Sequence, residues 1–472
     1  MDTEFDLPPS QFLAQPDALL AQLAQLVDTT TLAAHDFDVD NRTGFMPPEP
    51  PVTRLPEEYD AWELVLEEAS RGLKLGTRED LTDDDKAVSS RWRAQVESLP
   101  ILPIDSLEKS EVIIRRAHLV LSWILHFYIH TVPPSSKCIV IPRSLTLPLL
   151  RVSSQLRLPP VLTYSDTVLY NWALRENQLA PLPDLNNLRT VQTFTGTRDE
   201  EEFYLTSARM ELRGVEALEL MRSTMDEAFV GDDIATKRIT AYLFKLADVI
   251  SDLKTLLLAV REGCNPDVFY NEVRPWFMGV DSGEKVWLFE GLETDETLEE
   301  PKELSGPSAG QSSLIHALDI FLGVEEYSHS EQITGHDETI SISPSTTTIF
   351  PNPAKSAFLN RMQVYMPRHH RNFLDHLRNN PRPLRDIVAN SSNTSLLEAY
   401  NKAVTSLKEL RDAHIIIVTL YIIIPAGRAA EKERKGKEDG DSLLKGTGGT
   451  DLVKFLKDVR NGTAGAVLPS ES

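Results

Sequence analysis

Apolar residues recur at helical spacing along much of the chain, and the pattern is clearest near its C-terminal end. Between residues 395 and 424 they lie three, four or seven positions apart, which places them on one face of a helix. This predicted helix ends at Pro425, because proline lacks the backbone N–H that a helix interior needs. The face consists of Leu407, Leu410, His414, Ile417, Val418 and Tyr421. The imidazole of His414 therefore points into an apolar interior.

The N-terminal part of the chain mixes helical and extended patterns. One amphipathic helical pattern begins at Trp62, and a second, more apolar one covers residues 112–129. Residues 138–141 favour a β-strand, and the proline-rich run at 47–52 has to be extended or irregular. We therefore predict a small mixed α/β domain over residues 1–190.

The C-terminal part is predicted to be a large all-helical domain over residues 191–472. Periodicity is lost at 179–187, where turn-forming residues gather, so the boundary is placed near residue 190. Helix formers dominate from there on. The Ser/Thr-rich segment 325–354 and the charged, glycine-rich segment 426–450 interrupt the pattern, and we expect both to be mobile loops. The predicted fold class is mainly α.

Composition and charge narrow the possible partners. The chain of 472 residues is 41% hydrophobic and 25% charged, as in folded proteins, and its length favours two domains. With 48 basic and 71 acidic side chains, its net charge is −23. Such a surface repels phosphate backbones and anionic lipid. We expect neither nucleic acid nor a membrane as a partner.

The chain shows the features of a cytoplasmic protein. It begins with acidic and polar residues instead of a basic region followed by an apolar stretch. The apolar runs at 119–128 and 415–424 are shorter than the roughly 18 residues that a membrane-spanning helix needs. Its two cysteines, Cys138 and Cys264, have no zinc or disulfide spacing, which fits a reducing compartment.

His414 is the first candidate for chemistry. An imidazole on an apolar helical face, with no other ligand-type residue three or four positions further on, suits a single axial bond to haem iron better than a multi-histidine site. A histidine satisfied within the core explains the same pattern. His126 and His130 are spaced for metal binding, but no carboxylate completes a set, so helix packing is favoured for them.

Ser308 and Arg274 are weaker candidates. Residues 306–310 match G-x-S-x-G, the elbow that presents a nucleophilic serine, but the elbow needs a buried strand directly upstream. The preceding residues 299–305 are polar and contain proline, so a position just before a helix start is favoured and a serine hydrolase is a remote alternative. Arg274 lies among aromatic residues and could hold a carboxylate bidentately, or form a surface ion pair.

In their order along the chain, these and neighbouring segments resemble the indoleamine 2,3-dioxygenase family over about residues 35–460. An ordered series over most of a chain is far more specific than a lone motif. The segments that carry it are Pro159–Asp166 with Asn171 and Trp172, Phe203–Ser207, Arg274 in its aromatic setting, Ser308–Ser313, Tyr365–Pro367, His370–Phe373, Arg411–Thr419 with Tyr421 and Ile422, and Gly446–Asp451.

The resemblance implies that haem b lies between the two domains, with His414 as the proximal iron ligand and an open axial position for O2. It implies that Arg274 binds the substrate carboxylate and that Thr447 lies in a mobile loop closing over the ligand. It implies a substrate pocket lined by Tyr164, Phe203, Ser207, Phe269 and Ser308. Its implied cofactor-binding residues, besides His414, are Ser308, Ala309, Asp319 and Arg411.

The implied reaction inserts both atoms of O2 across the indole C2–C3 bond of L-tryptophan or a related indoleamine. The product would be N-formylkynurenine, in the first step of the kynurenine pathway towards NAD, and no side chain is placed as a general acid or base. Pro307 stands where the family usually has glycine, and Thr167 and Tyr204 vary the chemistry at or near the pocket. A haem-binding member with little turnover is the alternative. We expect a monomer, and the preferred indoleamine stays open.

Overall fold

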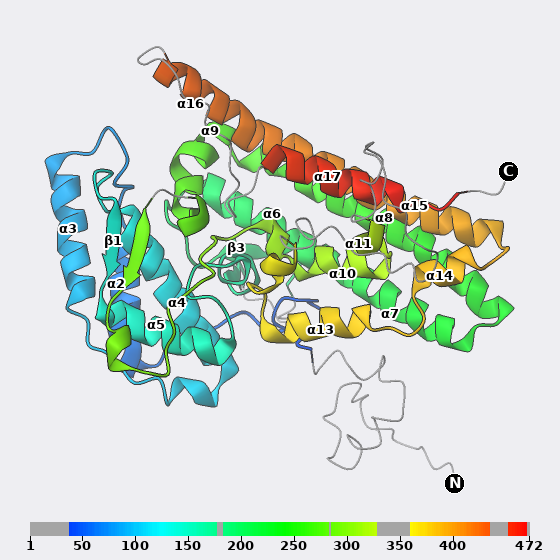
Figure 1. Cartoon of the computed structure of the whole chain (residues 1–472), viewed down its shortest axis with the longest axis horizontal. Coiled ribbons are helices and arrows are strands. Elements are labelled where there is room, and N and C mark those ends of the chain that lie inside the picture. Colours follow the sequence, from blue (N-terminus) through cyan, green and yellow to red (C-terminus); the bar gives the residue numbers. More distant parts are fainter. Residues whose placement is uncertain (1–36, 177–182, 283–284, 328–358, 435–451, 470–472) are drawn as a thin grey trace, which may run out of the picture.

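The computed structural model describes residues 37–176, 183–282, 285–327, 359–434 and 452–469. Helices dominate these residues, as predicted, and the strands within the described ranges are four short segments. Four helices form one end of the molecule (Figure 1): α2 (Asp60–Ser70), α3 (Asp83–Glu97), α4 (Glu111–His130) and α5 (Arg143–Leu156). The proline-rich run before them has no regular secondary structure, as its composition predicts.

The helix α4 is the centre of this end because it is apolar on nearly all sides. Trp123 of α4 stacks on Phe194 with ring centroids 4.1 Å apart, and Phe194 stacks on Trp276 at 5.1 Å. By length and composition α4 could cross a membrane, but 83% of its most apolar window is buried inside the protein. Packing in the core therefore explains its hydrophobicity.

The four strands form two small sheets. One strand, β4 (Val286–Phe289), lies within residues 191–472, so the prediction that this range is all-helical is wrong there. Strand β1 (Cys138–Ile141) pairs in parallel with β4 (Val286–Phe289), and β2 (Trp172–Leu174) pairs antiparallel with β3 (Leu188–Thr190). The strand β4 thus returns from the C-terminal half to the N-terminal end. It is only four residues long, and its pairing partner is remote, so its own sequence pattern could not predict it.

The C-terminal half is built around long helices. Three of them, α6 (Arg198–Arg213), α7 (Val215–Val230) and α8 (Asp233–Gly263), follow one another with short breaks, as predicted. The helix α15 (Thr394–Val418) packs along α8, and apolar residues of both are buried between them. Shorter helices complete this half (Figure 1): α10 (Ser313–Phe321), α11 (Val324–Tyr327), α13 (Arg368–Arg378), α14 (Leu384–Ala389) and α17 (Leu452–Gly465).

The helical run that contains His414 does not end at Pro425, contrary to the prediction. A π-helical turn, η10 (Thr419–Ile423), follows α15, and α16 (Ile424–Arg434) extends it (Figure 1). Pro425 is the second residue of α16, where the π turn has already interrupted the regular hydrogen-bond ladder and a backbone N–H is not needed. Residues Thr394–Glu431 pass the membrane length and composition test, with 33% of the window buried.

The two expected loops are only partly described. Residues 426–434 are helical, so the loop predicted at 426–450 is wrong for that part, and its remainder, residues 435–450, lies outside the described residues. The loop predicted at 325–354 begins inside α11, and the rest of it also lies outside the described residues. Helix formers such as Ala429, Ala430 and Glu431 continue the helix even though Gly427 lies within it.

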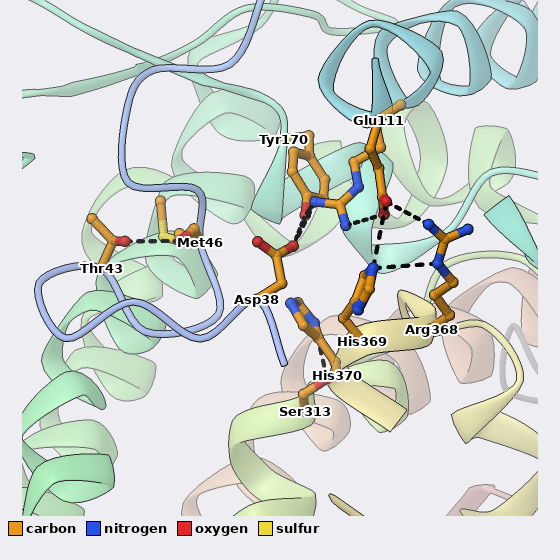
Figure 2. Close-up of polar contacts among 10 residues, drawn as sticks. Asp38, Thr43, Met46, Glu111, Tyr170, Ser313, Arg368, His369 and His370 are labelled. Atoms are coloured by element: carbon orange, nitrogen blue, oxygen red, sulfur yellow. Dashed lines mark hydrogen bonds and ion pairs between the residues drawn. The ribbon is translucent and has the colours of Figure 1, made fainter. Parts of the chain in front are cut away.

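An ionic network joins the segment before α2 to α4 and α13 (Figure 2). The Nη1 of Arg115 donates to Asp38 Oδ2 at 2.7 Å, and its Nη2 donates to Glu111 Oε1 at 2.7 Å. Arg368 of α13 donates to the other oxygen of Glu111 at 2.5 Å. Glu111 therefore bridges an arginine of the N-terminal end and an arginine of the C-terminal half.

Candidate active site

His414 lies in the last turns of α15, on the face that the apolar periodicity predicts. Its side chain is partly exposed, and neither ring nitrogen has a hydrogen-bond partner in the part of the chain that the structure describes. Desolvation, with a smaller effect from the charge of Arg411, lowers the pKa of His414 to about 4. The imidazole is therefore neutral at neutral pH, with a nitrogen lone pair available to a metal.

An ion pair lies one helical turn before His414. Arg411 Nη2 donates to the two carboxylate oxygens of Asp319 at 2.5 and 2.6 Å, and Arg411 also binds the hydroxyl of Thr463 on α17. Burial raises the pKa of Asp319, while the charges of Arg411 and His316 oppose this rise. The structure thus brings together two of the residues that we predicted around the cofactor.

An aromatic group links three elements beside α15. Phe203 of α6 contacts Phe269 with ring centroids 4.4 Å apart, and Phe269 contacts Tyr421 of η10 edge-on at 5.7 Å. The hydroxyl of Tyr421 donates to the carbonyl of Cys264 at the end of α8, at 2.6 Å. Two predicted pocket residues, Phe203 and Phe269, are therefore neighbours, and Tyr421 connects them to the helical run of His414.

A buried polar cluster ties Tyr164 to two other segments. The hydroxyl of Tyr164 donates to Glu211 Oε1 of α6 at 2.9 Å, and the hydroxyl of Ser312 donates to the same oxygen at 2.8 Å. Burial raises the pKa of Tyr164 well above its ordinary value, and the charge of Glu211 adds to this, against smaller effects from the hydroxyls of Ser312 and Ser207. Tyr164 is therefore a permanent hydrogen-bond donor near neutral pH.

Ser308 precedes a short 3₁₀ turn, η9 (Ala309–Gln311), and its hydroxyl accepts a hydrogen bond from Gly310 N at 3.2 Å. This confirms a position just before a helical turn. The structure describes all residues from 290 to 312, and none of them forms a strand. The context that a nucleophile elbow needs is absent there, so the hydrolase interpretation of Ser308 is wrong.

Arg274 follows a second π-helical turn, η5 (Phe269–Val273), and begins the 3₁₀ helix η6 (Arg274–Phe277). Its guanidinium carbon lies 5.5 Å from the centre of the Tyr270 ring, and burial lowers its pKa from the ordinary value. Arg274 and Phe269 are thus held at opposite ends of one turn. The predicted contact of Arg274 with a substrate carboxylate stays a prediction, and Thr447 lies outside the described residues.

Three π-helical turns occur in the described ranges; two of them adjoin predicted site residues, and η10 begins five residues after His414. Besides η5 and η10, the turn η4 (Ser165–Leu169) begins directly after Tyr164. Such turns are rare and are frequent at functional sites. Hydrophobic periodicity does not reveal them, because a single widened turn changes the spacing by only one residue.

The donor set around His414 fits a single axial ligand. Among the described residues, no group of three or more His, Cys, Asp and Glu side chains could hold a metal ion. His126 donates to the carbonyl of Trp276 at 2.7 Å, and His130 donates to the carbonyl of Met278 at 3.0 Å, which confirms their packing role. A neutral histidine on the apolar face of a helix is the kind of ligand that haem iron takes.

Comparison with known proteins decides the family. The family model described as indoleamine 2,3-dioxygenase matches residues 33–466. The chain belongs to the indoleamine 2,3-dioxygenase family. It is therefore an oxidoreductase of the dioxygenase class, and the family implies a haem cofactor with O2 as co-substrate.

Relatives in the family come from animals and fungi. Indoleamine 2,3-dioxygenase 1 of Rattus norvegicus is 30% identical over 433 residues, covering 92% of this chain and 95% of the relative. Indoleamine 2,3-dioxygenase of Saccharomyces cerevisiae is 31% identical over 447 residues, covering 89% and 90%. 6-Hydroxytryptophan 2,3-dioxygenase of Fusarium equiseti is 31% identical over 437 residues, covering 90% and 95%.

Two residues of this family member were missed by reasoning from its sequence. Glu211 lies four residues after Ser207 and eight after Phe203, so it shares their face of α6, and this spacing is the signal that could have found it. Gln311 accepts a hydrogen bond from Tyr164 N at 2.8 Å and donates to Gly306 O at 2.9 Å. No sequence pattern singles out Gln311, because both of its contacts depend on the folded loop.

Proposed function

We propose that this chain binds haem b through His414 and cleaves the indole ring of L-tryptophan, or of a related indoleamine, to give N-formylkynurenine. This would be the first step of the kynurenine route towards NAD. The observation that carries the proposal is the neutral imidazole of His414, which has no hydrogen-bond partner among the described residues and lies on α15 between the buried apolar residues Leu410 and Ile417. The family match supports both the cofactor and the reaction class.

Different side chains would bind the haem, the indole ring and the carboxylate of the substrate. Bound haem would supply the iron that activates dioxygen. Phe203 and Phe269 offer an apolar surface on which an indole ring can pack and from which water is excluded. Arg274 carries the positive charge that suits an α-carboxylate. Ser308, Ala309 and the paired Asp319 and Arg411 would help to hold the haem.

No side chain of this group is required to move a proton. Tyr164 keeps its proton at neutral pH, because burial raises its pKa well above the ordinary value. Ser207 and Ser308 offer hydroxyls that adjust hydrogen bonding without acting as bases. The residues therefore act by orienting the indole and excluding water, while the oxidation belongs to the cofactor.

The preferred indoleamine is the finer part of the proposal. L-Tryptophan is the first choice, and a hydroxylated tryptophan is the second, because one 31% identical relative is named a 6-hydroxytryptophan dioxygenase. A polar cluster of Tyr164, Glu211 and Ser312 adjoins the predicted pocket, and it favours testing hydroxylated substrates. We further propose that the protein is a cytoplasmic monomer. We also propose that it binds neither nucleic acid nor membranes, which its net charge of −23 supports.

The decisive test compares the wild type with His414→Ala. We expect the wild type to give a haem absorption band when reconstituted and to form N-formylkynurenine from L-tryptophan after reduction in air. His414→Ala should lose both, because the axial bond is gone. Ile416→Ala is the matched control, since Ile416 lies two residues further along the same helix with its side chain 48% exposed. It should retain both properties.

The other outcomes are equally informative. Haem binding by the wild type without product from any tested tryptophan would reduce the function to haem binding. Failure of the wild type to hold haem, or a normal haem spectrum in His414→Ala, would overturn the proposal.

A further inference from the structure

Glu211 is a buried carboxyl group that the proposed reaction does not use. Its side chain is 2% exposed, and Tyr164 and Ser312 both donate hydrogen bonds to its Oε1. Its Oε2 is buried without a hydrogen-bond partner. A buried polar oxygen without a partner costs stability. Stability alone therefore does not explain a glutamate at this position, and its two hydrogen bonds indicate another role.

Those hydrogen bonds join three segments that are distant in sequence. Glu211 lies on α6, Tyr164 precedes η4, and Ser312 follows η9, with 47 and 101 residues separating Glu211 from its two donors. Gln311 forms a second link, because it accepts from the backbone N–H of Tyr164 and donates to Gly306 O. Tyr164 is thus held through both its side chain and its backbone.

Each of the three segments carries predicted substrate-pocket residues. Tyr164 belongs to the first, Phe203 and Ser207 to α6, and Ser308 to the third. The α6 and α10 ends of this arrangement are in close contact: a Cβ on Gly214, directly after α6, would lie 2.3 Å from the Leu314 side chain. The three segments therefore have little freedom to shift against one another. Two of them, those of Tyr164 and Ser312, donate hydrogen bonds to Glu211.

We propose that Glu211 is a positioning residue, whose Oε1 sets the spacing of the Tyr164 and Ser308 segments against α6 and so sets the fit of the substrate. It acts through Tyr164 and Ser312 and does not contact the substrate. The inference rests on the proposed function for its kinetic consequence, but its structural part is independent of turnover. Glutamine at this position keeps an acceptor oxygen, whereas leucine removes it at similar size.

The structural part is tested by hydrogen exchange on the full chain. Glu211→Leu should speed amide exchange about tenfold in peptides covering residues 163–169 and 308–313, because both lose a buried hydrogen bond to one anchor. Glu211→Gln should stay within about twofold of the wild type in the same peptides. Tyr400→Phe is the control, because it removes another buried tyrosine hydroxyl bond, to Leu322 O at 2.7 Å, and should leave both peptides unchanged.

The kinetic part uses the haem-loaded proteins with L-tryptophan. We expect Glu211→Leu to raise KM about tenfold while kcat changes less than about threefold, and Glu211→Gln to restore KM. Unchanged exchange in both peptides of Glu211→Leu, or the same acceleration throughout the molecule, overturns the inference. So does a normal KM in that variant. If the wild type turns over no tryptophan, the proposed function is wrong. Hydrogen exchange alone then tests the role of Glu211.

Discussion

At the scale of single residues, Glu211 differs from most acidic side chains of this chain because it is buried away from any basic partner that the structure describes. Desolvation raises the pKa of its carboxyl to about 7, against the opposing hydrogen bonds from Ser312 and Tyr164. The folded protein therefore holds a proton at Glu211 that an exposed glutamate releases at lower pH.

This proton makes the stability of the protein depend on pH with a defined sign. Between the ordinary glutamate pKa of 4.5 and the folded value of about 7, the folded state binds more protons than the unfolded state. The free energy of unfolding therefore falls as the pH rises through this window, by about 3 kcal/mol in total. Glu211→Gln lacks the proton, so its stability relative to the wild type should increase as pH rises. Urea unfolding at several pH values measures this.

The control for this pH dependence is the same substitution at an exposed position. Glu57→Gln should leave the stability difference from the wild type constant across the window, because Glu57 is exposed. A constant difference for Glu211→Gln as well would show that its carboxyl is ionised normally in the folded protein.

The residues of the site differ in how far the sequence could predict them. His414 lies on a regular apolar face, so periodicity alone predicts its orientation. Its neighbours Arg411 and Asp319 are 92 residues apart, and only the family resemblance connects them. Spacing places Glu211 on the same face of α6 as Phe203 and Ser207, but its hydrogen bonds to Tyr164 and Ser312 depend on tertiary contacts that the sequence pattern does not show.

At the scale of elements, regular helices were predictable and their irregular ends were not. The helix α15 follows its apolar pattern, whereas the continuation through Pro425 depends on the π turn η10. A proline in sequence is ordinarily a stop signal. Only the folded chain shows that Tyr421 of this turn is fixed by Cys264 and Phe269, which supports the altered geometry.

The Ser308 loop depends on a close backbone approach that a glycine substitution can test. A Cβ on Gly306 would lie 1.7 Å from the carbonyl oxygen of Phe277, so Gly306→Ala must displace one of the two segments. We expect a loss of about 3 kcal/mol in unfolding free energy. We also expect a higher KM, since Ser308 moves with the loop. Urea unfolding and steady-state kinetics measure the two effects.

Gly72→Ala is the matched control for the Ser308 loop, because a Cβ on Gly72 would meet nothing within 4 Å. It should change stability by less than about 1 kcal/mol. If Gly306→Ala proved equally mild, the close approach between Gly306 and Phe277 would not constrain this loop.

At the scale of the whole molecule, the mainly α fold was predictable, but the return of a C-terminal strand to the N-terminal end was not. The parallel pairing of β1 with β4 places residues 286–289 at the N-terminal end of the molecule. Pairing between strands so far apart leaves no local signal in either of them. The C-terminal half therefore contributes part of the small end, and Trp287 of β4 packs into the same core as Trp123.

The tryptophans provide a natural probe of this arrangement. The chain has six, and all are buried: Trp62, Trp92, Trp123, Trp172, Trp276 and Trp287. No tryptophan follows residue 287, so tryptophan fluorescence reports the N-terminal end and the strand that joins it. Far-UV circular dichroism instead reports the helices of both halves. Comparing the two signals during unfolding shows whether the halves unfold together.

The ionic network around Glu111 is what should couple the halves. Arg115 is 11% exposed and donates to Asp38 and to Glu111, while Arg368 of α13 donates to Glu111 from the other half (Figure 2). Burial lowers the pKa of Arg115, but Tyr170, Asp38 and Glu111 together raise it above its ordinary value, so Arg115 stays charged. Removing Arg115 leaves two partly buried carboxylates without their shared partner.

We therefore expect Arg115→Leu to lose about 2 kcal/mol, less than a fully buried pair would because Asp38 and Glu111 are partly exposed. Its fluorescence transition in urea should move to lower concentration than its circular-dichroism transition, whereas the two coincide in the wild type. Arg54→Ala breaks an exposed network with Asp60 and Glu67, so both transitions should stay together and shift little. Coincident, unshifted transitions in Arg115→Leu would mean that packing of β4 against β1, and not charge, holds the two halves together.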